Sequence, residues 1–308
     1  KMNCENAVCI LNDRHSIPGE VFFKEGHGGL TTVCVNNKHA SAEILLHGAH
    51  VMSYTPHGEK PVLWMSGSSY FQPDKPVRGG IPVCWPWFGG HPSDKNKPAH
   101  GFARIADWQV VDTDTRPDGT LVILQLTEKN IPASFREFPF DIRMEVLVGN
   151  ELHVSLVIVN TGKEKMSFSA ALHSYFNVSD IASVSVEGLE NCKYLDTLDH
   201  IFKVQKGIIT FDAETDRVYL NTQSACVIDD PGFSRRIRIA KSGSNSTVVW
   251  NPWIEKSKRM PDFGDEEYHT MLCIETTNAE NDARVIAPAE RHTLKAIIGL
   301  EKKERGQK

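Results

Sequence analysis

A histidine and a glutamate, each set in an apolar segment, are the residues of this sequence best suited to moving protons. His173 lies within AALHSYF (170–176), and Glu275 follows the apolar run MLCI (271–274). Histidine is the commonest general acid or base near neutral pH, and a carboxylate is rarely buried without a partner. If the fold brings them together, the two side chains can take up and deliver protons at one site. Considered singly, His173 fits a satisfied core residue and Glu275 an exposed strand end.

Two further segments combine arginines with aromatic or histidine side chains. KPVRGGIPVCWPWFG (75–89) places Arg78 near two tryptophans, and its three prolines and three glycines exclude a regular central strand. HGFAR (100–104) places His100 and Arg104 around a glycine. Arginine binds oxyanions through a fork of donors, and aromatic faces pack against the C–H faces of sugars. Arg78 beside an aromatic wall therefore suits a sugar or an oxyanion, with a surface arginine on a proline-rich loop as the alternative. His100 and Arg104 can reach one cleft, with a solvated histidine near a loop as the alternative.

Two other polar residues are weaker candidates for the same site. Asp196, in YLD (194–196), offers a carboxylate to a sugar hydroxyl, and Lys256, in WNPWIEKS (250–257), offers a cation beside another aromatic wall. The polar, turn-rich stretch 89–99 joins the two arginine segments, so we expect it to form a surface loop at the rim of the site.

The elements that must position these residues are predicted to be short β-strands. In the stretch 140–159, apolar and polar side chains alternate on both sides of Gly149-Asn150, which predicts an antiparallel hairpin. No long window has the apolar spacing of an amphipathic helix. Many short strands with little helix predict an all-β sandwich. Further strands are expected at 121–126, 184–186, 208–211, 237–239, 248–249, 271–274 and 294–298.

Composition argues against several other classes of protein. The 308 residues are 40% hydrophobic and 24% charged, with a net charge of −5, which fits one folded domain over residues 1–308 and disfavours nucleic-acid binding. The first residues lack an apolar run of signal-peptide length, and no stretch is long enough to span a membrane. We therefore expect a cytoplasmic protein without membrane or nucleic-acid partners.

The sequence also lacks the motifs of metal and cofactor enzymes. Its seven cysteines are widely spaced, no Cys–His cluster indicates zinc, and no HExxH, GxGxxG, Walker or GxSxG pattern is present. We expect the cysteines to be small buried hydrophobic residues, as is usual in intracellular enzymes. Neither a metal ion nor an organic cofactor is expected.

Seven segments, taken in order, resemble the hexose-6-phosphate mutarotase branch of the aldose 1-epimerase family. Each is a weak signal alone, but the ordered set is specific and spans most of the chain. The resemblance implies a large antiparallel β-sandwich, the galactose mutarotase-like supersandwich, with the active site in a cleft across one sheet. This agrees with the strand pattern. The segments are LHGAHVMSY (46–54), KPVRGGIPVCWPWFG (75–89), HGFAR (100–104), LHSYF (172–176), YLD (194–196), WNPWIEKS (250–257) and IET (274–276).

The same resemblance assigns roles to the candidate residues. It implies that Glu275 is the general base and His173 the general acid of a reaction that opens and recloses a sugar ring. No metal or cofactor is needed for this chemistry. The resemblance further implies a monomer acting on a small sugar phosphate. The substrate ligands that it implies are Arg78, His100, Arg104, Asp196 and Lys256.

The predicted function is interconversion of the α and β anomers of a hexose 6-phosphate, with glucose 6-phosphate the first choice. One alternative is a mutarotase for neutral sugars, which would share the acid and base but not need paired arginines. A second is a non-catalytic carbohydrate-binding protein, which would keep the aromatic wall but not need both His173 and Glu275. A polysaccharide-cleaving enzyme on a related sandwich would need a long open groove and a different acid–base pair.

Overall fold

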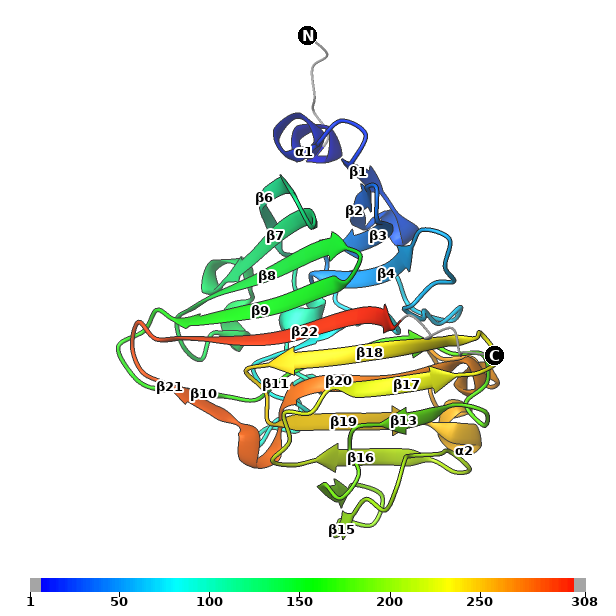
Figure 1. Cartoon of the computed structure of the whole chain (residues 1–308). Helices are drawn as coiled ribbons and strands as arrows, with labels where there is room; N and C mark the ends of the chain where they lie inside the picture. Colours follow the sequence, from blue (N-terminus) through cyan, green and yellow to red (C-terminus); the bar gives the residue numbers. More distant parts are fainter. Residues whose placement is uncertain (1–6, 302–308) are drawn as a thin grey trace.

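Two eight-stranded antiparallel sheets make up most of the molecule (Figure 1). The computed structural model describes residues 7–301, so Cys4 lies outside the described residues. We call the first the long-strand sheet because most of its strands have eight or more residues. Its order is β13 (Ser185–Glu187), β17 (Cys226–Asp230), β18 (Arg235–Ser242), β22 (Arg291–Glu301), β9 (Leu152–Asn160), β8 (Phe140–Gly149), β7 (Gly119–Thr127) and β6 (Gln109–Arg116).

The second, which we call the short-strand sheet, is built from briefer strands. Strands β11 (Ala170–Leu172) and β12 (Tyr175–Asn177) both pair with the longer β20 (Met271–Asn278), each along a different part of it. The remaining order is β15 (Ile201–Val204), β14 (Lys193–Asp196), β16 (Thr215–Tyr219), β19 (Ser246–Asn251), β20 (Met271–Asn278), β11 (Ala170–Leu172) and β5 (Val83–Cys84).

Smaller elements complete the described chain. Helices α1 (Ala7–His15) and α2 (Trp253–Ser257) are short, which confirms the expectation of little helix. A four-stranded sheet, which the sequence did not predict, contains β1 (Val21–Glu25), β2 (Thr31–Asn36), β3 (Ala40–Leu45) and β4 (His50–Pro56). A two-stranded sheet pairs β10 (Met166–Phe168) with β21 (Arg284–Ile286). Single 3₁₀ turns lie at His27–Gly29, Ala103–Ile105, Glu128–Asn130, Ala133–Phe135, Glu267–Thr270 and Glu280–Asp282.

The hairpin predicted for 140–159 is confirmed as β8 and β9. Val148 pairs with Leu152 across the turn, and the two strands stay in register for their whole length. Burial follows the alternation, because every second residue of β8 from Phe140 onward is buried. The pattern was readable because one face of these strands meets the core and the other meets solvent.

One predicted strand is wrong. In the stretch 208–211 only Ile209 makes a β-bridge, to Val186, and no strand forms. Gly207, directly before it, has a positive φ of 66°, so the chain is turning where a strand should begin. The predicted strands at 121–126, 237–239, 248–249, 271–274 and 294–298 fall within β7, β18, β19, β20 and β22, and the one at 184–186 overlaps β13, which begins one residue later.

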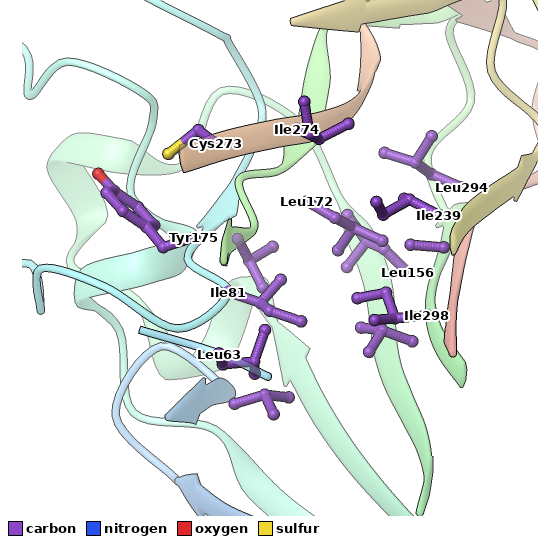
Figure 2. Packing of buried hydrophobic residues seen from close by; sticks show 14 of the residues in the cluster. Leu63, Ile81, Leu156, Leu172, Tyr175, Ile239, Cys273, Ile274, Leu294 and Ile298 are labelled. Carbon is purple, nitrogen blue, oxygen red and sulfur yellow. The ribbon is translucent and has the colours of Figure 1, made fainter. Parts of the chain in front are cut away.

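The main core lies between the two sheets (Figure 2). Leu156 and Leu294 of the long-strand sheet pack toward Leu172 and Ile274 of the short-strand sheet. Cys273, one residue before Ile274 on β20, points the other way, toward the ring of Tyr175. The short-strand sheet therefore has a core face and an opposite face, and the opposite face is free to carry polar groups.

The cysteines only partly follow expectation. Cys34, Cys84, Cys226 and Cys273 are free and buried, as predicted for small hydrophobic residues, and Cys192 is free and half-buried. Cys9 is disulfide-bonded, so the expectation is wrong there. Helix α1, which carries it, has no buried residue, and a thiol at that place has no core to enter. Within residues 7–301, no helix is both long and apolar enough to cross a membrane.

Candidate active site

The face of the short-strand sheet that points away from the core gathers the catalytic candidates. Side chains alternate along a strand, so Glu275 and Cys273 share one face of β20 while Ile274 lies on the other. Cys273 pairs with Trp250 on β19, and Trp250 pairs with Asp216 on β16. Trp250 and Asp216 therefore stand on the same face as Glu275. The stretches that carry them are far apart in sequence and meet only through the sheet.

His173 lies on the link between β11 and β12 and reaches this face from the side. Its backbone N–H donates to the carbonyl of Pro82, and its ring stacks on Tyr175 with 4.9 Å between centroids. Trp250 meets the ring edge-on at 6.0 Å. The imidazole is thus fixed on two sides, and its Nε2 lies 3.3 Å from Oε1 of Glu275. The two residues that sequence analysis selected for proton transfer are in contact.

Both members of this pair are buried and incompletely satisfied. Glu275 is 1% exposed, and its second oxygen, Oε2, has no hydrogen-bond partner among residues 7–301. Nδ1 of His173 likewise finds no partner in the described part of the chain. Buried polar atoms are almost always hydrogen-bonded in folded proteins, so two orphaned atoms on adjacent residues indicate a site prepared for a ligand.

Burial shifts the pKa values of the two residues in opposite directions. It raises the pKa of Glu275 well above the ordinary carboxyl value, and the nearby carboxylate of Asp216 adds to this shift. It lowers the pKa of His173 well below the ordinary histidine value, with further lowering by His100, Arg78 and Arg104. When the pair carries a single proton, the favoured form therefore has that proton on Glu275, so that both side chains are neutral.

His100 approaches the pair through a tight backbone turn. Gly101 has φ +74°, and a Cβ there would lie 2.0 Å from the carbonyl oxygen of Trp85, so only glycine fits. The ring of His100 lies 5.7 Å from that of His173.

The protonation state of His100 is set by its surroundings. Burial lowers its pKa to about 3, and Arg104 and Arg78 act in the same direction. Its Nδ1 accepts a hydrogen bond from the backbone N–H of Gly89, which leaves Nε2 to carry the proton of the neutral ring. His100 is therefore a neutral donor near the pair.

Arg104 has a guanidinium that is only partly satisfied. It lies in the 3₁₀ turn Ala103–Ile105, and its Nη2 donates to the carbonyl of Ala99 on the rim loop. Nε is buried and has no hydrogen-bond partner in residues 7–301. Burial lowers the pKa of Arg104, opposed by Cys84 and assisted by Arg78. A half-buried cation with no carboxylate partner among residues 7–301 is suited to binding an anion.

Arg78 differs from Arg104 because it is already paired. Its Nε and Nη2 donate to the two oxygens of Asp262, each at 3.1 Å, and its Nη1 donates to the hydroxyl of Tyr175 at 3.0 Å. Although burial opposes it, these neighbours raise the pKa of Arg78 further. Sequence analysis missed Asp262 and the role of Tyr175, since Asp262 lies 184 positions from Arg78 in an ordinary polar turn.

Asp216 and Lys256 extend the site along the same face. Lys256 lies 3.2 Å from Glu214 and 3.7 Å from Asp216, and its ammonium lies 5.7 Å from the ring centre of Trp250. Burial raises the pKa of Asp216, and Lys256 opposes the shift. Sequence analysis did not select Asp216. The available signal was its spacing of two residues from the apolar Val218, which puts both side chains on one face of β16.

Asp196 is the predicted site residue that the fold does not bring to this face. On β14 Asp196 pairs with Arg217, which pairs with Val249 on β19, which pairs with Ile274 on β20. Directly paired residues share a face, so Asp196 stands on the core face of the sheet. Its Oδ2 accepts from Nζ of Lys203 at 2.7 Å. A shift of one residue along a strand reverses the face, so the YLD motif alone could not settle where the carboxylate points.

The polar stretch 89–99 is a loop next to the site, as predicted, with no helix or strand. It is anchored rather than loose. Trp87 donates from Nε1 to the carbonyl of Pro98 at 2.9 Å, and Lys97 lies over the Trp87 ring and pairs with Glu137. The anchored loop holds Ala99, the acceptor of Arg104, in place.

Residues 31–299 match the sequence profile of the family described as aldose 1-epimerase. The chain belongs to the aldose 1-epimerase family. A protein of Escherichia coli K12 named as a candidate glucose-6-phosphate 1-epimerase is 35% identical over 270 residues, covering 87% of this chain and 90% of the relative. A protein of Cenchrus ciliaris with the same name is 37% identical over 255 residues, covering 79% of this chain and 76% of the relative.

Solved structures of aldose 1-epimerase relatives have the same fold. The crystal structure of a candidate mutarotase from Salmonella typhimurium matches with a TM-score of 0.86 at 31% identity, over 94% of this chain and 96% of that chain. A galactose mutarotase related enzyme from Lactobacillus acidophilus matches with a TM-score of 0.69 at 14% identity, over 90% of this chain and 99% of that chain, a likeness of fold alone. The predicted family and the predicted all-β, mutarotase-like fold are confirmed.

Proposed function

We propose that this aldose 1-epimerase family member interconverts the α and β anomers of a hexose 6-phosphate. The observation that carries the proposal is the 3.3 Å contact between His173 and Glu275, both buried and each with a polar atom that has no partner in the described part of the chain. The names of the relatives, glucose-6-phosphate 1-epimerase, make glucose 6-phosphate the substrate to test first.

Anomer exchange requires two proton transfers and no net chemical change. Glu275 removes the proton from the hydroxyl on C1 while protonated His173 delivers one to the ring oxygen. The C1–O5 bond breaks, and O1 becomes an aldehyde oxygen. Rotation about C1–C2 presents the other face of the carbonyl, and the reverse transfers reclose the ring. A positioned acid or base is typically worth about 10²–10⁴-fold in rate.

The pKa directions of the pair fit this cycle through one shared proton. Burial favours neutral Glu275 beside neutral His173, whereas ring opening starts from the carboxylate and the imidazolium. Transfer of one proton across the 3.3 Å contact converts the first form into the second. After ring opening, the proton from O1 is on Glu275 and His173 has lost its own, so the neutral pair accompanies the open-chain sugar.

The phosphate is assigned to the arginine side of the site. Arg104 has an unpaired buried Nε, whereas Arg78 is held by Asp262, so Arg104 is the principal phosphate ligand and Arg78 the secondary one. His100, as a neutral Nε2–H donor, is assigned to the ring oxygen or a nearby hydroxyl. On the opposite side, Asp216 replaces Asp196 as the hydroxyl-binding carboxylate, with Lys256 beside it.

Several features of the proposal stay predictions. We treat residues 1–308 as one domain, because one continuous core cluster joins elements from β1 to β22. A monomer, a cytoplasmic location and the absence of nucleic-acid partners are likewise retained as predictions.

The proposal is tested by following pure α-glucose 6-phosphate to anomeric equilibrium, beside free glucose and galactose. We expect acceleration with the phosphate, and Arg104→Ala should raise KM for glucose 6-phosphate by about 10–100-fold while changing KM for free glucose little, because hydrogen bonds to charged groups contribute about 1.5–3 kcal/mol. Arg238→Ala, an exposed arginine on the long-strand sheet, is the matched control.

The other outcomes decide between the alternatives. Acceleration of free sugars only would favour a neutral aldose 1-epimerase and remove the phosphate site. An equal effect of Arg104→Ala on both kinds of sugar would also count against phosphate recognition. No acceleration with any sugar would favour a carbohydrate-binding protein.

A further inference from the structure

Cys273 adds a third metal-binding type of side chain to the catalytic pair. One ligand atom from each of His173, Cys273 and Glu275 can be chosen so that all three lie within 4.8 Å of one another, and all three residues are buried. Cys273 and Glu275 share a face of β20, and His173 approaches from the β11–β12 link. A sequence search for zinc motifs misses this group because its histidine and cysteine lie 100 positions apart.

We propose that His173, Cys273 and Glu275 form a binding site for a thiophilic divalent cation of the zinc class, and that the bound cation inhibits the enzyme reversibly. Sulfur, imidazole nitrogen and carboxylate oxygen are the ligands that Zn²⁺ takes in proteins. The binding part stands without the proposed function, whereas the inhibition part rests on it.

The spacing of the ligand atoms suits one tetrahedral ion. Zinc lies about 2.0–2.3 Å from its ligands, which places neighbouring ligand atoms roughly 3.3–3.8 Å apart. Nε2 of His173 and Oε1 of Glu275, at 3.3 Å, already have this separation. Because one ligand atom of each residue lies within 4.8 Å of the others, modest side-chain movement lets all three reach one cation, and three protein ligands leave a fourth position open.

Charge balance also favours a divalent cation here. The thiol of Cys273 must lose its proton on binding, so the ion is exchanged for at least one released proton. The resulting thiolate and the Glu275 carboxylate carry two negative charges, which match the two positive charges of the ion. Asp216 stands on the same sheet face, and Asp262 offsets the charge of Arg78.

Inhibition follows from the identity of the ligands. An ion on His173 and Glu275 occupies the lone pairs that would accept and return substrate protons. Cys273 takes no part in the proposed proton transfers, so it distinguishes metal binding from catalysis. Removing it should weaken the metal without removing the acid or the base.

The binding test uses Co²⁺ as a spectroscopic substitute for Zn²⁺ on the full-length protein. A cobalt–thiolate bond gives an intense near-ultraviolet absorption band, which we expect in the wild type and in Cys226→Ser but not in Cys273→Ser. Cys226 is equally buried on the long-strand sheet, which makes its variant a matched control for thiol loss in a core. A band that is absent from the wild type, or persists in Cys273→Ser, would overturn the proposal.

Zinc affinity provides the quantitative measurement. Substitutions that only support metal ligands already weaken binding by 10–100-fold, so loss of the Cys273 ligand should weaken Zn²⁺ binding by about 100-fold or more. If Cys273→Ser fails to fold, calorimetry of the wild type in buffers of different ionisation heat replaces it. Proton release on Zn²⁺ binding is then expected, and binding without proton release would rule out the thiolate site.

The activity test separates this proposal from the proposed function. Zn²⁺ should slow anomer exchange in the wild type, a chelator should restore it, and Cys273→Ser should need about 100-fold more Zn²⁺ for the same inhibition. Cobalt binding without anomerase activity would retain the metal site and reject the enzyme. Anomerase activity with equal zinc sensitivity in both proteins would retain the enzyme and reject the metal site.

Discussion

The two eight-stranded sheets differ in what they bury: the long-strand sheet contributes to the core, whereas the short-strand sheet also carries the candidate active site. On β8, in the long-strand sheet, the core-facing residues are Phe140, Ile142, Met144, Val146 and Val148, all of them apolar and fully buried. The short-strand sheet packs Leu172 and Ile274 into the core on one face, and on the other face it buries Glu275 beside Trp250 and Cys273. Strands β8 and β9 pair without a register shift, and their buried faces only have to pack.

The short-strand sheet carries a local cost in stability at its site. Glu275 and His173 are buried with orphaned atoms, and each such unsatisfied group costs about 1–3 kcal/mol of stability. Strands β5, β11 and β12 have only two or three residues, which lets the links between them carry His173 to the site. Function and stability are therefore opposed on this sheet, and variants on the two sheets should behave differently.

The largest difference is expected for glutamates on matching strands. Glu275→Gln removes the base and should reduce kcat/KM for glucose 6-phosphate by about 10²–10⁴-fold. Glu145→Gln on β8, whose side chain stands on the solvent side of the long-strand sheet, should leave kcat/KM unchanged. Stopped-flow polarimetry or a coupled anomer assay measures both. Near-normal turnover in Glu275→Gln would remove Glu275 from the mechanism.

The same Glu275→Gln variant should be more stable than the wild type at neutral pH. The folded state raises the pKa of Glu275 above its ordinary value of 4.5, so the wild type loses stability as the pH rises from 4.5 toward the folded pKa. Glutamine does not ionise and avoids this loss. We expect a gain in unfolding free energy at pH 7 that shrinks below pH 4.5, because only the wild type pays for keeping this group protonated in the folded state. Thermal melts at both pH values would contradict the argument if the gain did not shrink.

A smaller effect is expected at Asp216, which tests how far the site extends across the sheet. Asp216→Asn removes a hydroxyl ligand and should lower kcat/KM by about 10–100-fold, the range of a hydrogen bond to a charged group. It also removes a negative charge that raises the pKa of Glu275, so the acidic limb of the kcat/KM profile should move to lower pH. A loss of activity without movement of that limb would show that Asp216 does not influence the pKa of Glu275.

The strand pattern could be predicted from sequence wherever one face of a strand meets water. The β8–β9 hairpin was predicted for that reason. The 208–211 run failed because the same apolar pattern is interrupted by the turn at Gly207, and a bridge at Ile209 replaces a strand. The four-stranded sheet of β1 to β4 was not predicted, since Val33, Cys34 and Val35 on β2 are buried without alternation.

Site residues could be predicted only where a titratable side chain lies in an otherwise apolar stretch of sequence. His173 and Glu275 stood out as titratable groups in apolar runs. Asp262 did not, because a carboxylate in a polar turn looks ordinary until the fold brings it to Arg78. Which of two arginines is unpaired, and which of two aspartates faces the site, depends on partners and register that no local pattern records.

The smallest effect is expected for Asp196, the matched control of Asp216 on the other face of the same sheet. Asp196→Asn should leave KM and kcat unchanged, because its side chain lies on the side opposite Glu275 and pairs with Lys203. Loss of this partly exposed ion pair should reduce stability by no more than about 1 kcal/mol. Denaturant unfolding and the anomer assay on Asp196→Asn and Asp216→Asn measure this. A tenfold loss of activity in Asp196→Asn would contradict this placement. The substrate would then have to reach around the edge of the sheet to contact both faces.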